Sequence, residues 1–144
     1  MININLSISI YRPINRVFDF ISTPENDFQW QYGTLASARI SEGAIKIGTT
    51  FRSNSNLMGY RTQSTFEVTE YEQGKKYGFK SLSGPLQSFT IFALHMAEGC
   101  TQVNLSMQAN KINSIELNEN ILGKKMKKQF KENLVMLKNI LESE

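Results

Sequence analysis

Three glutamates, Glu67, Glu70 and Glu72, form the densest acidic cluster of the sequence and are the first residues that suggest chemistry. In an extended strand, side chains two positions apart point to the same side. Glu70 therefore shares a side with Phe66 and Val68, whereas Glu67 faces the other way. A carboxyl group among apolar side chains has a raised pKa and can exchange protons with a bound molecule. Glu70 is thus the candidate catalytic residue, and the simpler interpretation is a strand-end glutamate in water.

The other reactive side chains are isolated in the sequence. The one histidine, His95, and the one cysteine, Cys100, have no clustered ligand-type neighbours, so no metal site is expected. His95 alternates out of phase with Phe92 and Leu94, which predicts an exposed sheet residue. The sequence has no Gly-x-Ser-x-Gly turn, phosphate loop or dinucleotide fingerprint. Nucleophilic hydrolysis, phosphoryl transfer and hydride transfer therefore lack support, and no cofactor is expected.

Aromatic residues in the middle of the chain can either line a cavity or fill a core. A small-molecule pocket needs broad apolar contact and a few polar groups. Tyr60 and Ser64 share the strand side of Phe66 and offer polar contacts to a ligand, unless they point into water at a sheet edge. The candidate ligand-binding residues are Trp30, Tyr32, Phe51, Tyr60, Ser64, Phe66, Tyr77, Phe79, Phe92, Leu94, Met126, Phe130 and Leu134.

The first elements that must position these residues are a strand and two short helices. Apolar and polar residues alternate strictly from Ile2 to Ile10, which is typical of a strand with one buried face. Pro13 suits the first turn of a helix, and the following apolar residues have helical spacing as far as Ile21. Pro24 begins a second short helix that ends near Trp30.

The rest of the chain predicts six strands and one long helix. From about Thr34 to Lys111, β-type runs are separated by turn residues, and short turns between neighbouring strands indicate an antiparallel sheet. Apolar residues then recur every three or four positions, at Leu122, Met126, Phe130, Leu134, Leu137 and Leu141. We therefore expect an α+β helix-grip fold, with a curved seven-stranded antiparallel sheet wrapped around the C-terminal helix. An incompletely filled interior leaves a cavity for a ligand.

Length and composition are those of one globular domain, expected to span residues 1–144. The 144 residues are 40% hydrophobic and 20% charged, which suits a single core. The apolar runs, such as Phe89 to Leu94, are far shorter than the roughly 18 to 20 residues that span a bilayer, so no membrane span is expected. One cysteine permits no internal disulfide and agrees with a reducing compartment. We expect a cytoplasmic protein that is a monomer or a homodimer.

The basic charge is concentrated in one part of the predicted long helix. The net charge is +3, and five lysines lie between Lys124 and Lys131. Such a face can meet an anionic partner, but a solvated helix surface explains it equally well. No nucleic-acid partner is expected, and a partner for this lysine face stays an open alternative.

Several phrases of the sequence resemble those of one protein family. They are Arg12-Pro13-Ile14, Val17-Phe18-Asp19-Phe20-Ile21, Pro24-Glu25-Asn26, Gln29-Trp30, Ser41-Glu42-Gly43, Ile47-Gly48-Thr49, Phe66 to Glu72, Tyr77-Gly78-Phe79-Lys80 and Gly99 to Val103. In order and spacing they are similar to polyketide cyclase/dehydrase-like members of the START/Bet v 1-like (SRPBCC) superfamily. The resemblance implies a seven-stranded sheet around the last helix and an internal pocket for hydrophobic compounds. No catalytic motif of the characterised cyclases matches particular positions here.

Three functions follow from these observations. The first is a binding module for a small hydrophobic ligand, which is lipid-, polyketide- or aromatic-like and lies between the sheet and the C-terminal helix. The second is an enzyme of the polyketide cyclase or dehydratase type, with Glu70 as the candidate acid or base. The third is a protein-interaction domain like the relatives that assist chaperones, which would use an apolar patch or the lysine face.

Overall fold

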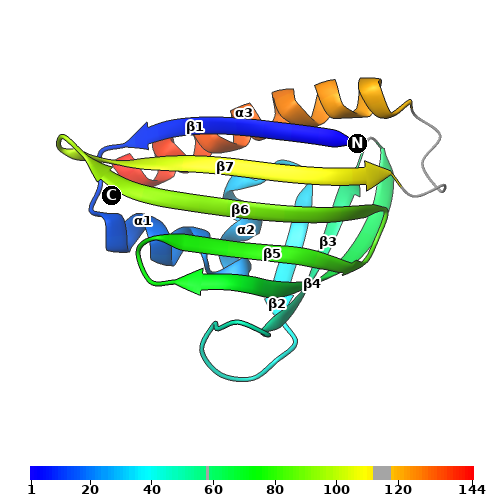
Figure 1. Cartoon of the computed structure of the whole chain (residues 1–144), viewed down its shortest axis with the longest axis horizontal. Coiled ribbons are helices and arrows are strands. Elements are labelled where there is room, and N and C mark those ends of the chain that lie inside the picture. Colours follow the sequence, from blue (N-terminus) through cyan, green and yellow to red (C-terminus); the bar gives the residue numbers. More distant parts are fainter. Residues whose placement is uncertain (58, 112–117) are drawn as a thin grey trace.

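A curved antiparallel sheet and one long helix make up most of the molecule (Figure 1). The computed structural model describes residues 1–57, 59–111 and 118–144. In chain order the elements are β1 (Ile2–Ile10), α1 (Ile14–Ile21), a 3-10 helix (Pro24–Asn26), α2 (Asp27–Trp30), β2 (Thr34–Arg39), β3 (Thr50–Leu57), β4 (Tyr60–Glu72), β5 (Lys76–Ser83), β6 (Leu86–Ala97), β7 (Cys100–Lys111) and α3 (Glu119–Glu142). The predicted element order and the α+β helix-grip fold are confirmed.

All seven strands belong to one sheet. Their order is β1-β7-β6-β5-β4-β3-β2, and every neighbouring pair is antiparallel. Tight turns produce this arrangement, as between β6 and β7, where Ala97 pairs with Cys100 and Gly99 has a φ of +69°. Glycine adopts positive φ without the steric cost that other residues meet. β1 and β2 are left as the two edges.

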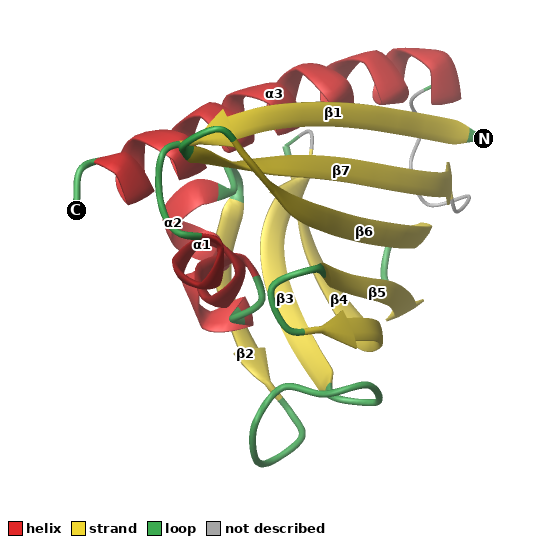
Figure 2. Cartoon of the chain, turned by 60° about the vertical axis from the view of Figure 1, so that its left-hand side comes forward, coloured by secondary structure: helices red, strands yellow, loops and turns green. Residues whose placement is uncertain are grey.

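The helices cover the concave side of the sheet (Figure 2). α3 lies along β1 and crosses the open side of the curve, while α1 and α2 close one end. The buried residues of α3 recur at helical spacing and face the sheet: Leu122, Met126, Asn133, Leu134, Leu137 and Leu141. One helix is thus the main cover for the inner face of the sheet.

A bulge in β4 reverses the facing of its last residues. Val68 pairs with Phe79, but the next pair is Glu70 with Gly78, so Thr69 is an extra residue in β4. An extra residue shifts every later side chain to the opposite face. Val68 is buried in the core, and Tyr71, rather than Glu70, continues the inner face by packing against that core.

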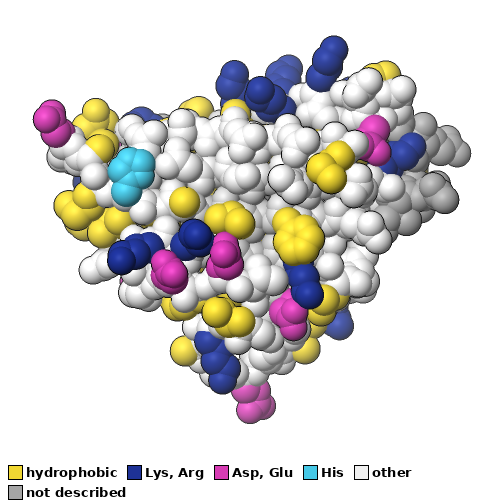
Figure 3. All heavy atoms as spheres, viewed as in Figure 1, with side chains coloured by type: hydrophobic (Ala, Val, Ile, Leu, Met, Phe, Trp, Pro, Cys, Tyr) yellow, Lys and Arg dark blue, Asp and Glu magenta, His cyan; other side chains and the backbone are white. Residues whose placement is uncertain are grey.

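Charged residues lie on the outer face of the sheet. On that face Lys76 pairs with Glu70 and Lys80 pairs with Glu67, at 3.9 Å and 3.5 Å. Figure 3 looks onto the outer face and shows acidic and basic side chains side by side, with a group of basic side chains along the α3 edge. Among the described residues, no helix is both long and apolar enough to cross a membrane.

The C-terminal end of α3 is fastened to the link between β1 and α1. The Arg12 guanidinium donates hydrogen bonds to the main-chain oxygens of Leu141, at 2.7 Å from Nε, and Glu142, at 3.0 Å from Nη2. The Lys138 ammonium donates to the Ser9 carbonyl oxygen at 2.6 Å. The last carbonyls of a helix have no partner within the helix, and a cation there also interacts favourably with the helix dipole. Arg12 therefore both caps α3 and positions it.

Replacing Arg12 tests this fastening. Arg12→Met should lower the free energy of unfolding by about 2 kcal/mol, because it removes charge-assisted hydrogen bonds to the helix end. Arg52→Met, at an exposed position of β3, is the matched control and should change stability by less than about 0.5 kcal/mol. Urea denaturation measures both. Equal effects of the two substitutions would contradict a capping role for Arg12.

Candidate ligand-binding site

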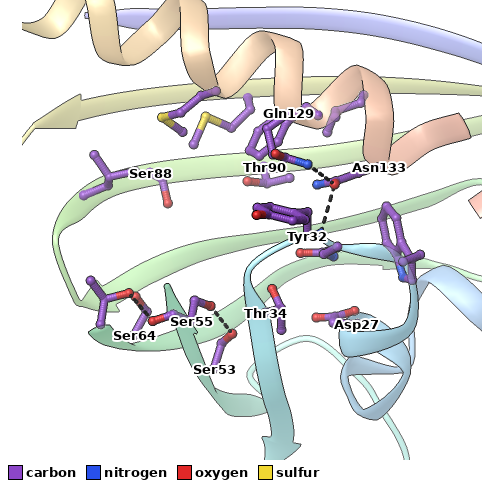
Figure 4. A pocket seen from close by; sticks show the side chains of 18 of the residues that line it. Asp27, Tyr32, Thr34, Ser53, Ser55, Ser64, Ser88, Thr90, Gln129 and Asn133 are labelled. Carbon is purple, nitrogen blue, oxygen red and sulfur yellow. Dashed lines mark hydrogen bonds between the residues drawn. The ribbon is translucent and has the colours of Figure 1, made fainter. Parts of the chain in front are cut away.

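A cavity of about 770 Å³ lies between the inner face of the sheet and the helices α2 and α3. Figure 4 shows side chains from α2, α3 and several strands converging on it. Its wall includes the exposed side chains of Tyr32, Lys125 and Lys128, so the cavity opens to solvent beside them. A space of this size is within the range of pockets that hold small organic molecules.

Most of the residues predicted to contact a ligand lie in the wall of this cavity. They come from α2 and the segment after it, the inner faces of β3 to β6 and the inner side of α3. They are Trp30, Tyr32, Phe51, Ser64, Phe66, Phe79, Phe92, Met126, Phe130 and Leu134. Their place in the wall follows from strand and helix periodicity, whereas their contact with a ligand stays a prediction.

Three of the predicted residues do not line the cavity. Tyr60 is exposed at the start of β4. Tyr77 and Leu94 face inward but are buried in the core cluster that also contains Phe18 and Leu137. At that end of the sheet the core fills the space, so inward-facing residues there pack rather than line the cavity.

Glu70 also lies outside the cavity wall. Its parity with Phe66 predicted an inward side chain, and this prediction is wrong because the bulge at Thr69 turns it to the outer face. The carboxylate lies 3.9 Å from the Lys76 ammonium, and the side chain is partly exposed. Glu70 therefore cannot reach a molecule held in this cavity.

His95 and Cys100 stay apart from the cavity. His95 is exposed on β6, as its strand parity predicted, and Cys100 is a half-buried free cysteine at the start of β7. Within residues 1–57, 59–111 and 118–144, no group of three or more metal-ligating side chains is found. These two residues thus have no part in the candidate site.

Aromatic rings form a continuous part of the cavity wall. Phe51 on β3 and Phe66 on β4 are cross-strand partners whose rings stack with centroids 5.2 Å apart. The Phe79 ring meets each of them edge-on at 5.3 Å. Trp30 meets Phe92 edge-on at 6.0 Å. Such geometries are the favourable ones for aromatic rings, so this wall is well packed and offers flat apolar surface to a ligand.

Sequence reasoning missed Asp27, a carboxyl group in the cavity wall. Burial, and secondarily the charge of Glu25, raise the pKa of Asp27 well above its usual range. Glu25 instead binds Arg39, which donates from its main-chain N at 2.8 Å and from Nη2 at 3.1 Å. These bonds lower the pKa of Glu25 although partial burial opposes them. Arg39 therefore serves Glu25, and among the described residues no ion pair of Asp27 is found.

The side-chain amide of Asn133 on α3 holds the segment after α2 at the entrance of the cavity. Asn133 is 6% exposed, and its Oδ1 accepts hydrogen bonds from the main-chain N of Tyr32 and from Gln129 Nε2, both at 3.0 Å. Figure 4 shows this junction between α3 and the segment after α2. The Tyr32 side chain beyond it is 80% exposed. A buried asparagine within an apolar helix face was the available signal in the sequence.

The lysine face of α3 borders the cavity. All five lysines between Lys124 and Lys131 are exposed, and no ion pair of theirs is found within the described parts of the chain. Lys125 and Lys128 belong to the cavity wall. Positive charge therefore lies along one side of the cavity opening.

Comparison with solved structures identifies the same architecture in distant proteins. A START superfamily protein from Mycobacterium smegmatis is similar with a TM-score of 0.85 and 9% identity, over 99% of both chains. A conserved protein from Geobacillus kaustophilus has a TM-score of 0.80 and 15% identity, over 98% of this chain and 95% of that one. Ara h 8.0201 has a TM-score of 0.74 and 11% identity, over 99% and 98%. At these identities the likeness shows the fold alone.

Comparison by sequence gives the family. No curated protein matches the chain significantly. A family model described as "Polyketide cyclase / dehydrase and lipid transport" matches residues 1–142, which include every element of the helix-grip fold and the whole cavity wall. Membership of this family implies a cavity for a hydrophobic ligand. The chain belongs to the polyketide cyclase/dehydrase and lipid transport family.

Proposed function

We propose that the protein binds and carries a small, largely apolar molecule in the cavity between the sheet and α3. The observation that carries the proposal is the cavity of about 770 Å³ with its wall of aromatic rings. Apolar molecules leave water for such surfaces with a gain of about 25 cal/mol per Å² buried. A cytoplasmic protein of this kind would hold its ligand apart from water and release it at another site.

The arrangement of the core supports a pre-formed site. Around the cavity, α3 is fixed at its C-terminal end by Arg12 and at its middle by Asn133. A cavity held open before the ligand arrives costs little ordering on binding. The aromatic side chains have few rotatable bonds, which lowers that cost further.

Co-purification of a ligand tests the proposal. Native mass spectrometry of the purified protein should show a bound small molecule that denaturing extraction releases. Thr90→Phe should abolish binding of this molecule. Thr90 is 8% exposed on the inner face of β6, and the phenyl ring of the substituted residue would occupy the cavity. A Thr90→Phe protein that folds and carries the same molecule at the same occupancy would contradict a ligand site in this cavity.

Substitutions of two α3 residues can distinguish a contribution to ligand binding from a contribution to core packing. Phe130 is half-buried in the cavity wall, whereas Leu137 is 0% exposed in the core. Phe130→Ala should cost about 1 to 2 kcal/mol of stability but weaken binding of the aromatic probe flavone about tenfold. Leu137→Ala should cost about 2 to 5 kcal/mol and leave the affinity of the folded protein nearly unchanged. Denaturation and titration calorimetry measure the two effects, and the reverse pattern would contradict these assignments.

Acid–base chemistry is the second candidate function, and Asp27 is the observation that favours it. A carboxyl group whose pKa is raised by burial keeps its proton to a higher pH and can donate it to an oxygen or carbon of the ligand. A cyclase or dehydratase reaction needs such a transfer. If the bound molecule is converted to a product by the wild-type protein, Asp27→Asn should bind it and fail to convert it. Conversion by Asp27→Asn at the wild-type rate would exclude this role.

Stability as a function of pH reports the protonation of Asp27. The unfolded chain ionises Asp27 near its ordinary pKa of 3.8, while the folded protein keeps the proton to a higher pH. The folded state then binds more protons, so this group lowers stability as pH rises above that value. The stability of Asp27→Asn relative to the wild-type protein should therefore increase as the pH rises above about 4. Urea denaturation at several pH values measures this, and a stability difference that does not change with pH would contradict the raised pKa of Asp27.

A further inference from the structure

Four hydroxyl side chains occupy positions where the inner face of a sheet is normally apolar. Ser53 and Ser55 on β3 lie directly across from Ser64 and Thr62 on β4, and all four line the cavity. We call them the hydroxyl patch. β3 is not an edge strand of the sheet, because it also pairs with β2. The next inner pair along the same two strands is Phe51 with Phe66, so aromatic and hydroxyl surfaces meet within one cavity.

Hydrogen bonds orient these hydroxyl groups. Ser37 on β2 is buried and donates its hydroxyl hydrogen to Ser53 Oγ at 3.1 Å, and Ser53 Oγ lies 3.3 Å from Ser55 Oγ. Since Ser53 accepts from Ser37, its own hydrogen is free to go to Ser55, whose hydrogen is then left for the cavity. Successive bonds in such a row polarise one another and strengthen the last donor. The row therefore leads from the buried Ser37 on β2 into the cavity.

The other two members add an acceptor and an unengaged hydroxyl. Thr62 donates to the Ser55 carbonyl oxygen at 3.3 Å, so its oxygen is left to accept a hydrogen bond. Within the described residues, the Ser64 hydroxyl has no hydrogen-bond partner. Gly84 leaves room for it, because a Cβ there would lie 2.4 Å from Ser64 Oγ. Figure 4 shows Ser53, Ser55 and Ser64 together on one wall, with Gln129 and Asn133 on the opposite side.

A plain hydrocarbon does not match this surface. Hydroxyl groups that lose water and gain no partner weaken binding, whereas a ligand oxygen replaces the water contacts with direct ones. Groups that both donate and accept are matched best by ligand hydroxyl groups. The flat rings of Phe51, Phe66 and Phe79 are matched by a ring system.

We infer that the cavity selects a ring compound that carries hydroxyl groups, with its rings on Phe51, Phe66 and Phe79 and at least one hydroxyl group on the hydroxyl patch. This assignment rests on the proposed binding function and names the chemical class of its ligand. Unsubstituted hydrocarbons and simple fatty chains are disfavoured, because they would leave the patch without partners.

A pair of matched probes tests the assignment. Flavone and its trihydroxy derivative apigenin share one ring scaffold and differ only in hydroxyl groups. In titration calorimetry the wild-type protein should bind apigenin at least about tenfold more tightly than flavone. The double variant Ser55→Ala/Thr62→Val removes two hydroxyl groups from the patch with little change of shape. Its preference for apigenin should fall by about tenfold.

A second double variant is the matched control. Ser83→Ala/Thr65→Val removes the same two kinds of hydroxyl group from a cross-strand pair on β5 and β4 that does not line the cavity. Its preference for apigenin should equal that of the wild-type protein. The role of the patch would be overturned if both double variants lost the preference for apigenin equally. It would also be overturned if the wild-type protein bound the two probes with equal affinity. Either result would leave the proposed binding function standing. Wild-type binding of neither probe would count against both. Thermal unfolding checks that each variant is folded. If a double variant does not fold, its two single substitutions are measured in its place.

Discussion

The structure depends on one geometric constraint, which is that a single helix must cover the concave face of a seven-stranded sheet. A helix with side chains is about 10 to 12 Å wide, so it fills the curve only where other elements help it. At the end covered by α1, Leu137 and Leu141 meet a complete core. Nearer the N-terminal end of α3, Met126 and Phe130 line the cavity opposite the sheet. The cavity is thus the part of the interior that the available side chains do not fill.

This constraint gives importance to the contacts that hold α3 in place. An amphipathic helix over a partly empty interior would gain apolar contact by moving inward. Arg12 resists this at the helix end, and Asn133 joins the helix to the backbone at Tyr32. Both contacts are directional hydrogen bonds, which fix a position more narrowly than apolar packing does. Polar contacts thus act together with apolar packing to hold α3 in its place over the sheet.

The sequence predicted the features that depend on local periodicity. Alternation from Ile2 to Ile10 and the spacing from Leu122 to Leu141 identified the first strand and the last helix and the faces they bury, and so placed Phe130 in the wall. Features set by tertiary structure were not predictable.

The bulge that turns Glu70 outward has no signal in the strand pattern. The run from Arg52 to Asn56 is entirely polar, so periodicity could not show that Ser53 and Ser55 face inward. Asp27 differs from Glu25 because its carboxyl group is more deeply buried and because Arg39 binds Glu25 instead.

Trp30 gives the molecule an optical consequence. It is the only tryptophan, it is 4% exposed in the cavity wall, and its Nε1 has no hydrogen-bond partner among the described residues. Indole fluorescence responds to the polarity and to the quenching groups around the ring. The ultraviolet emission of the unlabelled protein thus comes largely from the cavity wall, and its intensity and lifetime would report binding of the proposed ligand in real time. Exchange of a ligand between protein molecules can be timed without attaching a dye.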